Sequence, residues 1–358
     1  MFEKIKFMID YYNIHNLLNI RVEKCNVGLF HDVEYEYSFF KSEVPLENVD
    51  LSIRIGEFHP SLEDCKLVNR EFYVKKDYIF YQKKQTGYSW KVEIRNLTRQ
   101  SIEVKYFVKY SGFRSLFPIF ASQNIFMRSL LFISLLKKGY LLMHSSAVSD
   151  GNKASIFMGE AGVYKTTLAI KMMNDYGYGF LGEENVIIGK GKCYPYPFNY
   201  QSFSYKKDFW GFEKAKNKIQ RLKLILHLLL NRHNNLRLSS QSYELENLFY
   251  LKREMNQKTV TISPASKKAM VNFGLINELE EISSCPTHAL SGIPYNSFID
   301  IINVYLYSHD LKRTELIWPT VNSILKENID KINNYVLIEP MHFSEDLPMA
   351  INNLIKSK

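Results

Sequence analysis

Hydrophobic and polar residues alternate along several short stretches in the first third of the chain. The clearest stretch, 89–95, reads Ser-Trp-Lys-Val-Glu-Ile-Arg. A period of two predicts a strand with one buried face and one face in water. We expect an antiparallel sheet built from strands at 30–40, 49–56, 70–74, 78–82, 88–96 and 102–110. Because these strands carry no catalytic constellation, their expected role is packing, assembly or recognition of a substrate.

The spacing of apolar residues becomes helical after residue 115. Apolar residues at 125, 126, 130 and 133 form one stripe, which predicts a helix within 116–138 that ends at Gly139. Short apolar runs and helical patterns then follow one another to the end of the chain. We therefore expect two domains: a β-rich domain at 1–115 and, at 116–358, an α/β (α+β) domain with a mixed sheet and flanking helices.

Several elements are expected in the second half of the chain. Ser263 as N-cap and Pro264 as first helical residue predict a helix that runs to about Gly274. Other helices are expected at 294–306, at 318–332 and from 344 to about 356, with a strand at 335–338. The apolar stretch 219–230 must be buried, as a helix or as a strand.

Composition and charge narrow the class of protein. The 358 residues are 46% hydrophobic and 23% charged, which is typical of a globular protein. The net charge of +9 is dispersed along the chain, so nucleic acid is disfavoured as a partner. Four scattered cysteines and the absence of a signal peptide predict a cytoplasmic protein. The most apolar run, 129–136, is too short to cross a bilayer, so we expect no membrane partner.

A glycine-containing turn lies between a short apolar run at 154–158 and a segment with helical periodicity. The turn and the start of that segment read Gly159, Glu160, Ala161, Gly162, Val163, Tyr164, Lys165, Thr166 and Thr167. A strand, a glycine loop and a helix that begins with lysine and a hydroxyl residue form the usual cradle for nucleotide phosphates.

Tyr164 departs from this pattern, which has glycine before the lysine. Because a helical φ is open to tyrosine, the loop can form if the phenol ring points outward. A loop of this kind is weak evidence by itself. A strand, turn and helix that bind nothing is the alternative.

Residues on both sides of the loop strengthen the case for a site. Leu-Met-His-Ser-Ser-Ala-Val occupies 142–148, and Leu-Gly-Glu-Glu-Asn-Val occupies 181–186. With the loop, these three pieces resemble the HPr kinase/phosphorylase family, in particular its kinase-like relatives of unassigned substrate. They are more distantly similar to the nucleotide site of phosphoenolpyruvate carboxykinase.

The resemblance implies ATP and Mg²⁺ as ligands and assigns a role to each matching residue. Lys165 would bind the β- and γ-phosphates, Thr166 would ligate the metal, and Glu183 would accept the proton of the substrate hydroxyl. Glu184 would be a further metal ligand, and His144 matches a histidine of the family's active site. The alternatives are a buried histidine at a strand end and a solvated turn at 183–184. Glu183 is also one methylene longer than the family's aspartate.

Three functions follow as hypotheses. The first is a kinase for a hydroxyl on a small molecule, a peptide or a protein. Because relatives include tailoring kinases, the substrate by analogy would be a ribosomally made precursor peptide, and the hexamers of HPr kinases make a homo-oligomer the expectation. The second is a nucleotide sensor or scaffold in which Tyr164 has impaired the phosphate site. The third is carboxykinase-like transfer to a carboxylate or enolate. The sequence leaves the phosphate acceptor and the choice between ATP and GTP open.

Overall fold

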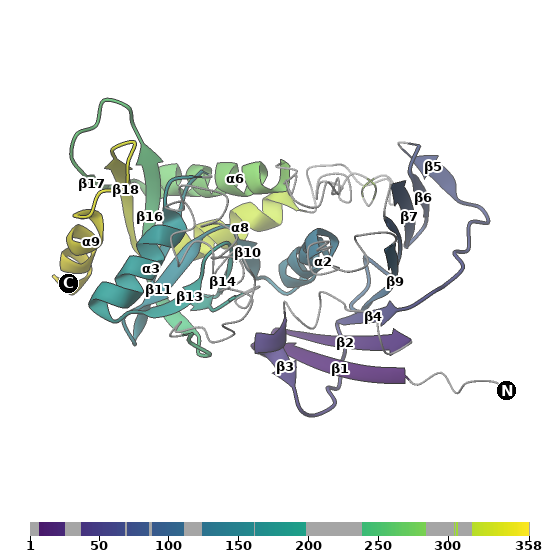
Figure 1. Cartoon of the computed structure of the whole chain (residues 1–358). Helices are drawn as coiled ribbons and strands as arrows, with labels where there is room; N and C mark the ends of the chain where they lie inside the picture. The colour runs from purple at the N-terminus through teal and green to yellow at the C-terminus, as the bar shows by residue number, and fades with distance from the viewer. Residues whose placement is uncertain are drawn as a thin grey trace, which may run out of the picture. The chain divides into compact units, whose positions relative to one another are not determined.

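The chain has a mixed α/β fold with two large sheets (Figure 1). This computed structural model describes residues 7–25, 37–68, 70–85, 88–110, 124–160, 162–197, 238–283, 304, 306 and 317–357. Contacts divide the chain into two compact units, Met1–Lys138 with Ile282–Trp318 and Gly139–Glu281 with Pro319–Lys358. The expected domain boundary at 115–116 lies outside the described residues. The same holds for the stretch 219–230, for most of the helix at 294–306 and for most of the strand at 30–40.

The first unit contains a nine-stranded sheet in the order β3-β1-β2-β4-β9-β8-β7-β6-β5. Its strands are β1 (Phe7–Ile14), β2 (Leu18–Cys25), β3 (Lys41–Ser42), β4 (Leu51–Ile55), β5 (Lys66–Val68), β6 (Phe72–Lys75), β7 (Tyr78–Gln85), β8 (Tyr88–Arg95) and β9 (Ile102–Tyr110). Five of these strands were predicted from alternation, and the hairpin β1–β2 was not. Helix α2 (Asn124–Lys137) confirms the predicted helix.

Two expectations for this sheet are wrong. The sheet is mixed, because β4 runs parallel to both of its neighbours, β2 and β9. The end of the expected strand at 30–40 is a short 3-10 helix, η1 (Ser38–Phe40). Glu93 also departs from the alternation: it is buried, because Tyr78, Arg95 and Lys105 all bind its carboxylate.

The second unit contains the other nine-stranded sheet. Its strands are β10 (Leu141–Met143), β11 (Ser146–Ser149), β12 (Lys153–Met158), β13 (Gly179–Gly182), β14 (Val186–Gly189), β15 (Lys192–Tyr194), β16 (Tyr243–Arg253), β17 (Thr261–Pro264) and β18 (Asn333–Glu339). Strands β12, β16 and β18 are adjacent and parallel. Their carboxyl ends therefore meet at one edge of the sheet, which is where open α/β sheets bind ligands.

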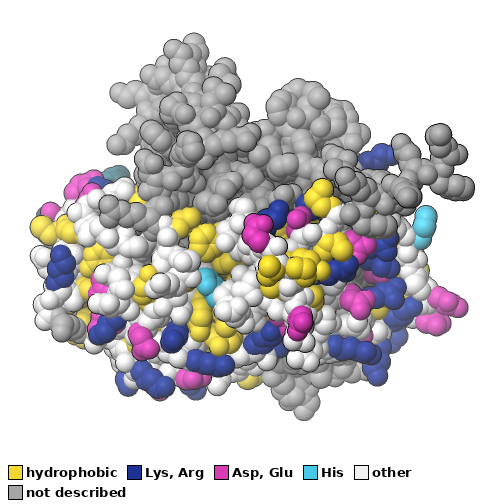
Figure 2. Space-filling model, turned by 90° about the horizontal axis from the view of Figure 1, so that it is seen from below, with side chains coloured by type: hydrophobic (Ala, Val, Ile, Leu, Met, Phe, Trp, Pro, Cys, Tyr) yellow, Lys and Arg dark blue, Asp and Glu magenta, His cyan; other side chains and the backbone are white. Residues whose placement is uncertain are grey.

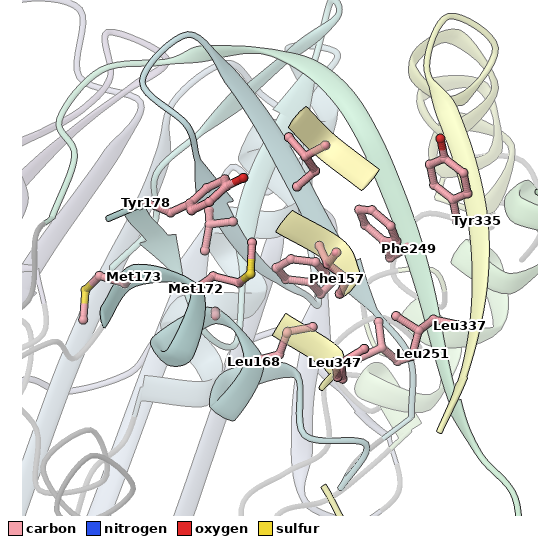
Figure 3. Close-up of a cluster of buried hydrophobic side chains, with 14 of the residues drawn as sticks. Phe157, Leu168, Met172, Met173, Tyr178, Phe249, Leu251, Tyr335, Leu337 and Leu347 are labelled. Carbon is pink, nitrogen blue, oxygen red and sulfur yellow. The ribbon is translucent and has the colours of Figure 1, made fainter. Parts of the chain in front are cut away.

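Helices cover both faces of this second sheet. Helix α3 (Lys165–Tyr176) and helix α9 (Leu347–Lys356) share a buried cluster with Phe157, Phe249 and Leu251 of the sheet (Figure 3). Tyr250 points to the opposite face and stacks on Phe273 of helix α6 (Lys267–Ser283), with 4.2 Å between ring centroids. The sheet thus lies between two layers of helices, because neighbouring strand residues face opposite ways.

The predicted start of the helix near residue 263 is wrong. Ser263 and Pro264 are the last residues of β17, and α6 begins at Lys267. The hydroxyl of Ser266 accepts a hydrogen bond from the Ala269 N–H at 3.2 Å, which is the usual pattern of an N-cap. A serine three residues further along therefore caps the helix.

The predicted end at Gly274 is also wrong, since α6 continues to Ser283. A Cβ added at Gly274 would lie 3.2 Å from the side chain of Leu325 in helix α8 (Trp318–Ile329). Gly274 therefore permits a close approach of two helices and does not terminate one. The predicted elements at 318–332, 335–338 and 344–356 are confirmed by α8, β18 and α9.

Charged side chains of both signs are mixed on the face drawn in Figure 2, where Lys and Arg are interspersed with Asp and Glu. Within the part of the chain that the structure describes, no helix is long and apolar enough to cross a membrane.

Candidate functional site

The loop at 159–164 leaves the carboxyl end of β12 and leads into α3. Gly159 has φ of 146°, and a Cβ there would lie 2.5 Å from the carbonyl oxygen of Leu251 in β16. The side chain of Val163 is buried in the cluster beneath α3. The loop is therefore pressed against the sheet edge at its start and anchored in the core near its end. Ala161 lies outside the described residues.

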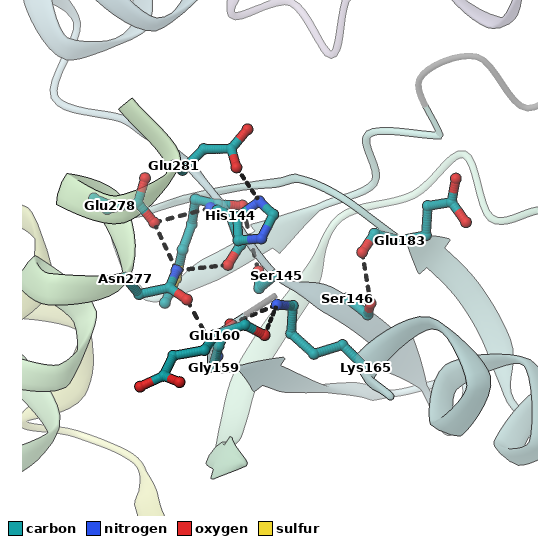
Figure 4. Close-up of polar contacts among 11 residues, drawn as sticks. His144, Ser145, Ser146, Gly159, Glu160, Lys165, Glu183, Asn277, Glu278 and Glu281 are labelled. Carbon is teal, nitrogen blue, oxygen red and sulfur yellow. Dashed lines mark hydrogen bonds and ion pairs between the residues drawn. The ribbon is translucent and has the colours of Figure 1, made fainter. Parts of the chain in front are cut away.

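Lys165 is the first residue of α3 and is only 8% exposed. Its Nζ donates hydrogen bonds to the carbonyl oxygens of Gly159 at 2.5 Å and Glu160 at 3.0 Å (Figure 4). Burial lowers the pKa of Lys165 to about 8, and the nearby carboxylates, chiefly Glu281 and Glu184, act in the opposite direction. The ammonium group thus lies inside the loop.

The amino end of α3 has no side-chain cap, because the side chain of the N-cap residue Tyr164 makes no hydrogen bond to the first turn of the helix. The first amides of a helix carry partial positive charge and need acceptors. An uncapped helix start beside a buried lysine is therefore suited to an anion.

Tyr164 has φ of 59° and ψ of 23°, which is the left-handed conformation. The expectation of a helical φ is wrong, and the position requires the conformation that glycine adopts most easily. The ring does point outward: its centroid lies 5.6 Å from that of Phe343, and the guanidinium carbon of Arg253 lies 4.7 Å from it. A left-handed residue costs about 1–2 kcal/mol. An aromatic pair and a cation–π contact contribute about 0.5–1.5 and 0.5–2 kcal/mol, so the ring contacts offset the strain.

Arg253 ends strand β16 and braces the loop. Its Nη1 donates to the carbonyl oxygen of Gly162 at 2.6 Å, and its Nη2 donates to that of Met341. Its register partner Glu339 ends β18 and is fully buried. Burial raises the pKa of Glu339 to about 7, which Arg253 opposes. Neither carboxyl oxygen of Glu339 has a hydrogen-bond partner among the described residues.

His144 follows β10 and is held by the last turns of α6 (Figure 4). Its N–H donates to Glu278 Oε1 at 2.9 Å, and its carbonyl accepts a hydrogen bond from Asn277 Nδ2 at 2.7 Å. Its Nδ1 lies 3.2 Å from Glu281 Oε2. Both the backbone and the imidazole of His144 are therefore positioned by one helix.

Asn277 also joins this helix to the loop, because its Oδ1 accepts the Gly159 N–H at 3.2 Å. Glu278 is 1% exposed, and burial raises its pKa to about 8, so it carries a proton at neutral pH. Asn277, Glu278 and Glu281 were not predicted as site residues from the sequence. Spacings of one and four residues would place them on adjoining faces of a helix, but the predicted helix ended before them.

Glu183 and Glu184 form the turn between β13 and β14. The Glu183 side chain is 6% exposed and its carbonyl accepts the Ser146 hydroxyl at 2.6 Å, whereas Glu184 is exposed. In the view of Figure 4 the Glu183 carboxyl points away from the Lys165 ammonium. The turn is thus half buried, and a wholly solvated turn does not describe it.

The hydroxyl residues lie in the first turn of α3, with Thr166 half-buried and Thr167 exposed. Among the described residues, no group of three or more His, Cys, Asp or Glu side chains is arranged to hold a metal ion. Mg²⁺ needs no such group in a nucleotide site, since phosphate oxygens and water supply most of its ligands. Thr166 and Glu184 carry a hydroxyl and a carboxylate, the oxygen ligands that Mg²⁺ takes, and the Glu184 carboxylate is close enough to Lys165 to raise its pKa.

No protein-family model matches the chain, and no curated protein has significant sequence similarity to it.

Proposed function

We propose that the protein is an ATP- and Mg²⁺-dependent kinase that transfers the γ-phosphate to a hydroxyl group. The observation that carries the proposal is the buried ammonium of Lys165 inside a glycine loop at the uncapped start of α3. Supporting it, this loop lies at the carboxyl edge of three parallel strands.

In the proposed reaction each residue of the site has a separate role. Lys165 exchanges the carbonyl oxygens of its own loop for phosphate oxygens and neutralises charge that develops on them during transfer. Thr166 and Glu184 would hold Mg²⁺, which would supply positive charge that stabilises the phosphates during transfer. Glu183 takes the proton of the attacking hydroxyl, and His144, oriented by Glu281, is the second base of the site. A peptide or small protein is the acceptor that the resemblance to kinase-like members of the HPr kinase/phosphorylase family suggests.

A second function, nucleotide sensing or scaffolding without transfer, is favoured by a specific observation. Several polar groups of the loop already have hydrogen-bond partners within the protein. Lys165 donates to two loop carbonyls, Asn277 accepts the Gly159 N–H, and Arg253 donates to the Gly162 carbonyl. A nucleotide must displace the first of these interactions in order to bind.

The test starts with titration calorimetry of ATP and Mg²⁺ against the parent and Lys165→Ala. We expect binding in the parent and a loss of at least about tenfold in the variant, since a charged hydrogen bond contributes about 1.5–3 kcal/mol. Lys268→Ala, which removes an exposed lysine near the start of α6 in the same unit, is the matched control and should bind as the parent does.

Incubation with γ-labelled ATP and candidate peptides then separates the two functions. Label on a peptide hydroxyl, lost in Glu183→Gln, supports the kinase. Lys165-dependent binding without any transfer to peptide, protein or alcohol leaves only the sensor. Absence of nucleotide binding refutes both the kinase and the sensor and leaves the scaffold.

A further inference from the structure

The environment of Tyr164 differs from that of a residue that merely obstructs a phosphate loop. Its ring lies against residues of two other elements, Arg253 of β16 and Phe343 of the segment between β18 and α9. Its hydroxyl is 3.4 Å from the Met341 carbonyl oxygen, which also accepts a hydrogen bond from Arg253. The ring is therefore fixed away from the loop interior by partners on more than one side.

Arg253 extends this arrangement to a second loop residue. The same guanidinium group that lies over the Tyr164 ring donates to the Gly162 carbonyl oxygen at 2.6 Å. Gly162 and Tyr164 both have positive φ, 84° and 59°. One arginine thus holds the two residues whose left-handed backbone turns the loop into the start of α3.

The segment that carries Phe343 is itself attached to α3. Lys171, two turns along α3, pairs with Glu345 and lies 5.7 Å from the Phe343 ring centroid. Tyr164 and Lys171 therefore fasten both ends of this segment to the helix whose amino end faces the loop.

We infer that Tyr164 is a positioning residue: with Arg253 and Phe343 it holds the loop in the form that accepts the phosphates of a nucleotide. The inference rests on the proposed function, because it concerns the same phosphate site. The sequence pattern alone would predict the opposite, namely that tyrosine at 164 impairs phosphate binding by the loop and that glycine would restore it. A glycine at 164 would adopt the same φ without strain, but it would release the loop from both partners and let it sample other conformations.

Calorimetry of ATP and Mg²⁺ binding tests the inference with the full chain. We expect Tyr164→Gly to weaken ATP binding by about tenfold, or about 1.4 kcal/mol, and Tyr164→Phe to recover most of the loss because it keeps the ring. Arg253→Gln should weaken binding to a similar degree. Lys252→Gln removes the same charge from the neighbouring exposed residue of β16 and should have no effect.

The double variant Tyr164→Gly/Arg253→Gln distinguishes positioning from two separate effects. We expect it to bind ATP no more than about twofold more weakly than either single variant, because both changes break the same contact. Far-UV circular dichroism and the melting temperature of each variant are recorded alongside. If Tyr164→Gly fails to fold, Phe343→Leu, which removes the other ring, takes its place and should also weaken binding.

The outcomes separate the inference from the proposed function. The inference is overturned if Tyr164→Gly binds ATP as tightly as the parent or more tightly, or if the losses add fully in the double variant. In either case, binding that still depends on Lys165 would leave the proposed nucleotide site standing. A parent that shows no Lys165-dependent binding overturns both. If ATP binding changes as expected in every variant but no phosphoryl transfer is detected, the proposed kinase activity is refuted and the role of Tyr164 in positioning the loop is supported.

Discussion

Glu278 shows most directly how one buried residue gives the protein a measurable property. Its carboxyl is enclosed by the last turns of α6 and accepts hydrogen bonds from the His144 N–H and from Asn277 Nδ2 on a single oxygen. Burial raises its pKa from the ordinary 4.5 to about 8. The unfolded chain therefore loses this proton at a lower pH than the folded chain does.

The sign of the pH dependence follows from that difference. Between pH 4.5 and 8 the folded state holds more protons, so the free energy of unfolding falls as the pH rises, by at most about 1.4 kcal/mol per pH unit from this group. Glu278→Gln keeps an acceptor oxygen and cannot ionise. We expect this variant to be more stable than the parent at pH 9 and to lose most of that advantage at pH 5.

Urea unfolding of both proteins at pH 5, 7 and 9 measures the effect. Glu280→Gln, an exposed position on the same helix, is the control and should follow the parent at every pH. Parallel curves for Glu278→Gln and the parent would show that Glu278 ionises in the folded state as it does in the unfolded chain.

Among the elements, the loop between β12 and α3 depends on a close approach of two backbones. A Cβ at Gly159 would lie 2.5 Å from the Leu251 carbonyl oxygen, whereas the nearest atom to a Cβ at Gly162 is 3.8 Å away in the Arg253 side chain. Both glycines have positive φ, so alanine is strained at either position. Comparing an alanine substitution at Gly162 with one at Gly159 therefore distinguishes the cost of backbone strain from the cost of a steric conflict.

We expect Gly162→Ala to lower the free energy of unfolding by about 1 kcal/mol, the usual cost of a left-handed alanine. Gly159→Ala should cost a further 1–3 kcal/mol or so, because β16 or the loop must shift. Denaturant unfolding at one pH compares the two. Equal losses would mean that the loop moves away from β16 freely.

The sequence predicted these elements unevenly, for physical reasons. The run at 154–158, the loop and α3 were predicted because the hydrophobic period changes from a buried strand to a helix within ten or so residues. The length of α6 was not, because the reason for Gly274 lies in Leu325 of another helix. Local alternation likewise carries no information on which strands become neighbours, so the parallel pairing of β4 could not be seen.

The candidate site was predicted in its local part only. Lys165, Thr166 and the glycines are contiguous in sequence, so their pattern is visible. The left-handed conformation of Tyr164 is accompanied by contacts to Arg253 and Phe343, far along the chain, and the position of His144 depends on Asn277 and Glu281. Contacts of this kind leave no local signature.

For the whole molecule, the division into units makes a prediction about where the chain can be cut. The first unit consists of Met1–Lys138 and Ile282–Trp318. Its second piece therefore falls, in the order of the sequence, between the two segments of the other unit. Val304, Leu306 and Ile317 of that piece are buried. A fragment that ends at residue 138 lacks this second piece of the unit and loses the apolar area that these three side chains bury.

We therefore expect the fragment 1–138 to unfold without cooperativity or to aggregate. A fusion of 1–138 to 282–318 through a flexible glycine-serine linker of about 20 residues should unfold in a single transition, since such a linker closes a long loop at a small entropic cost. Thermal unfolding followed by circular dichroism distinguishes them, and the fusion with Val304 and Leu306 both changed to serine is the control that restores the defect. If 1–138 alone unfolds as cooperatively as the fusion, the segment 282–318 contributes nothing to that unit, and the first unit is continuous in sequence.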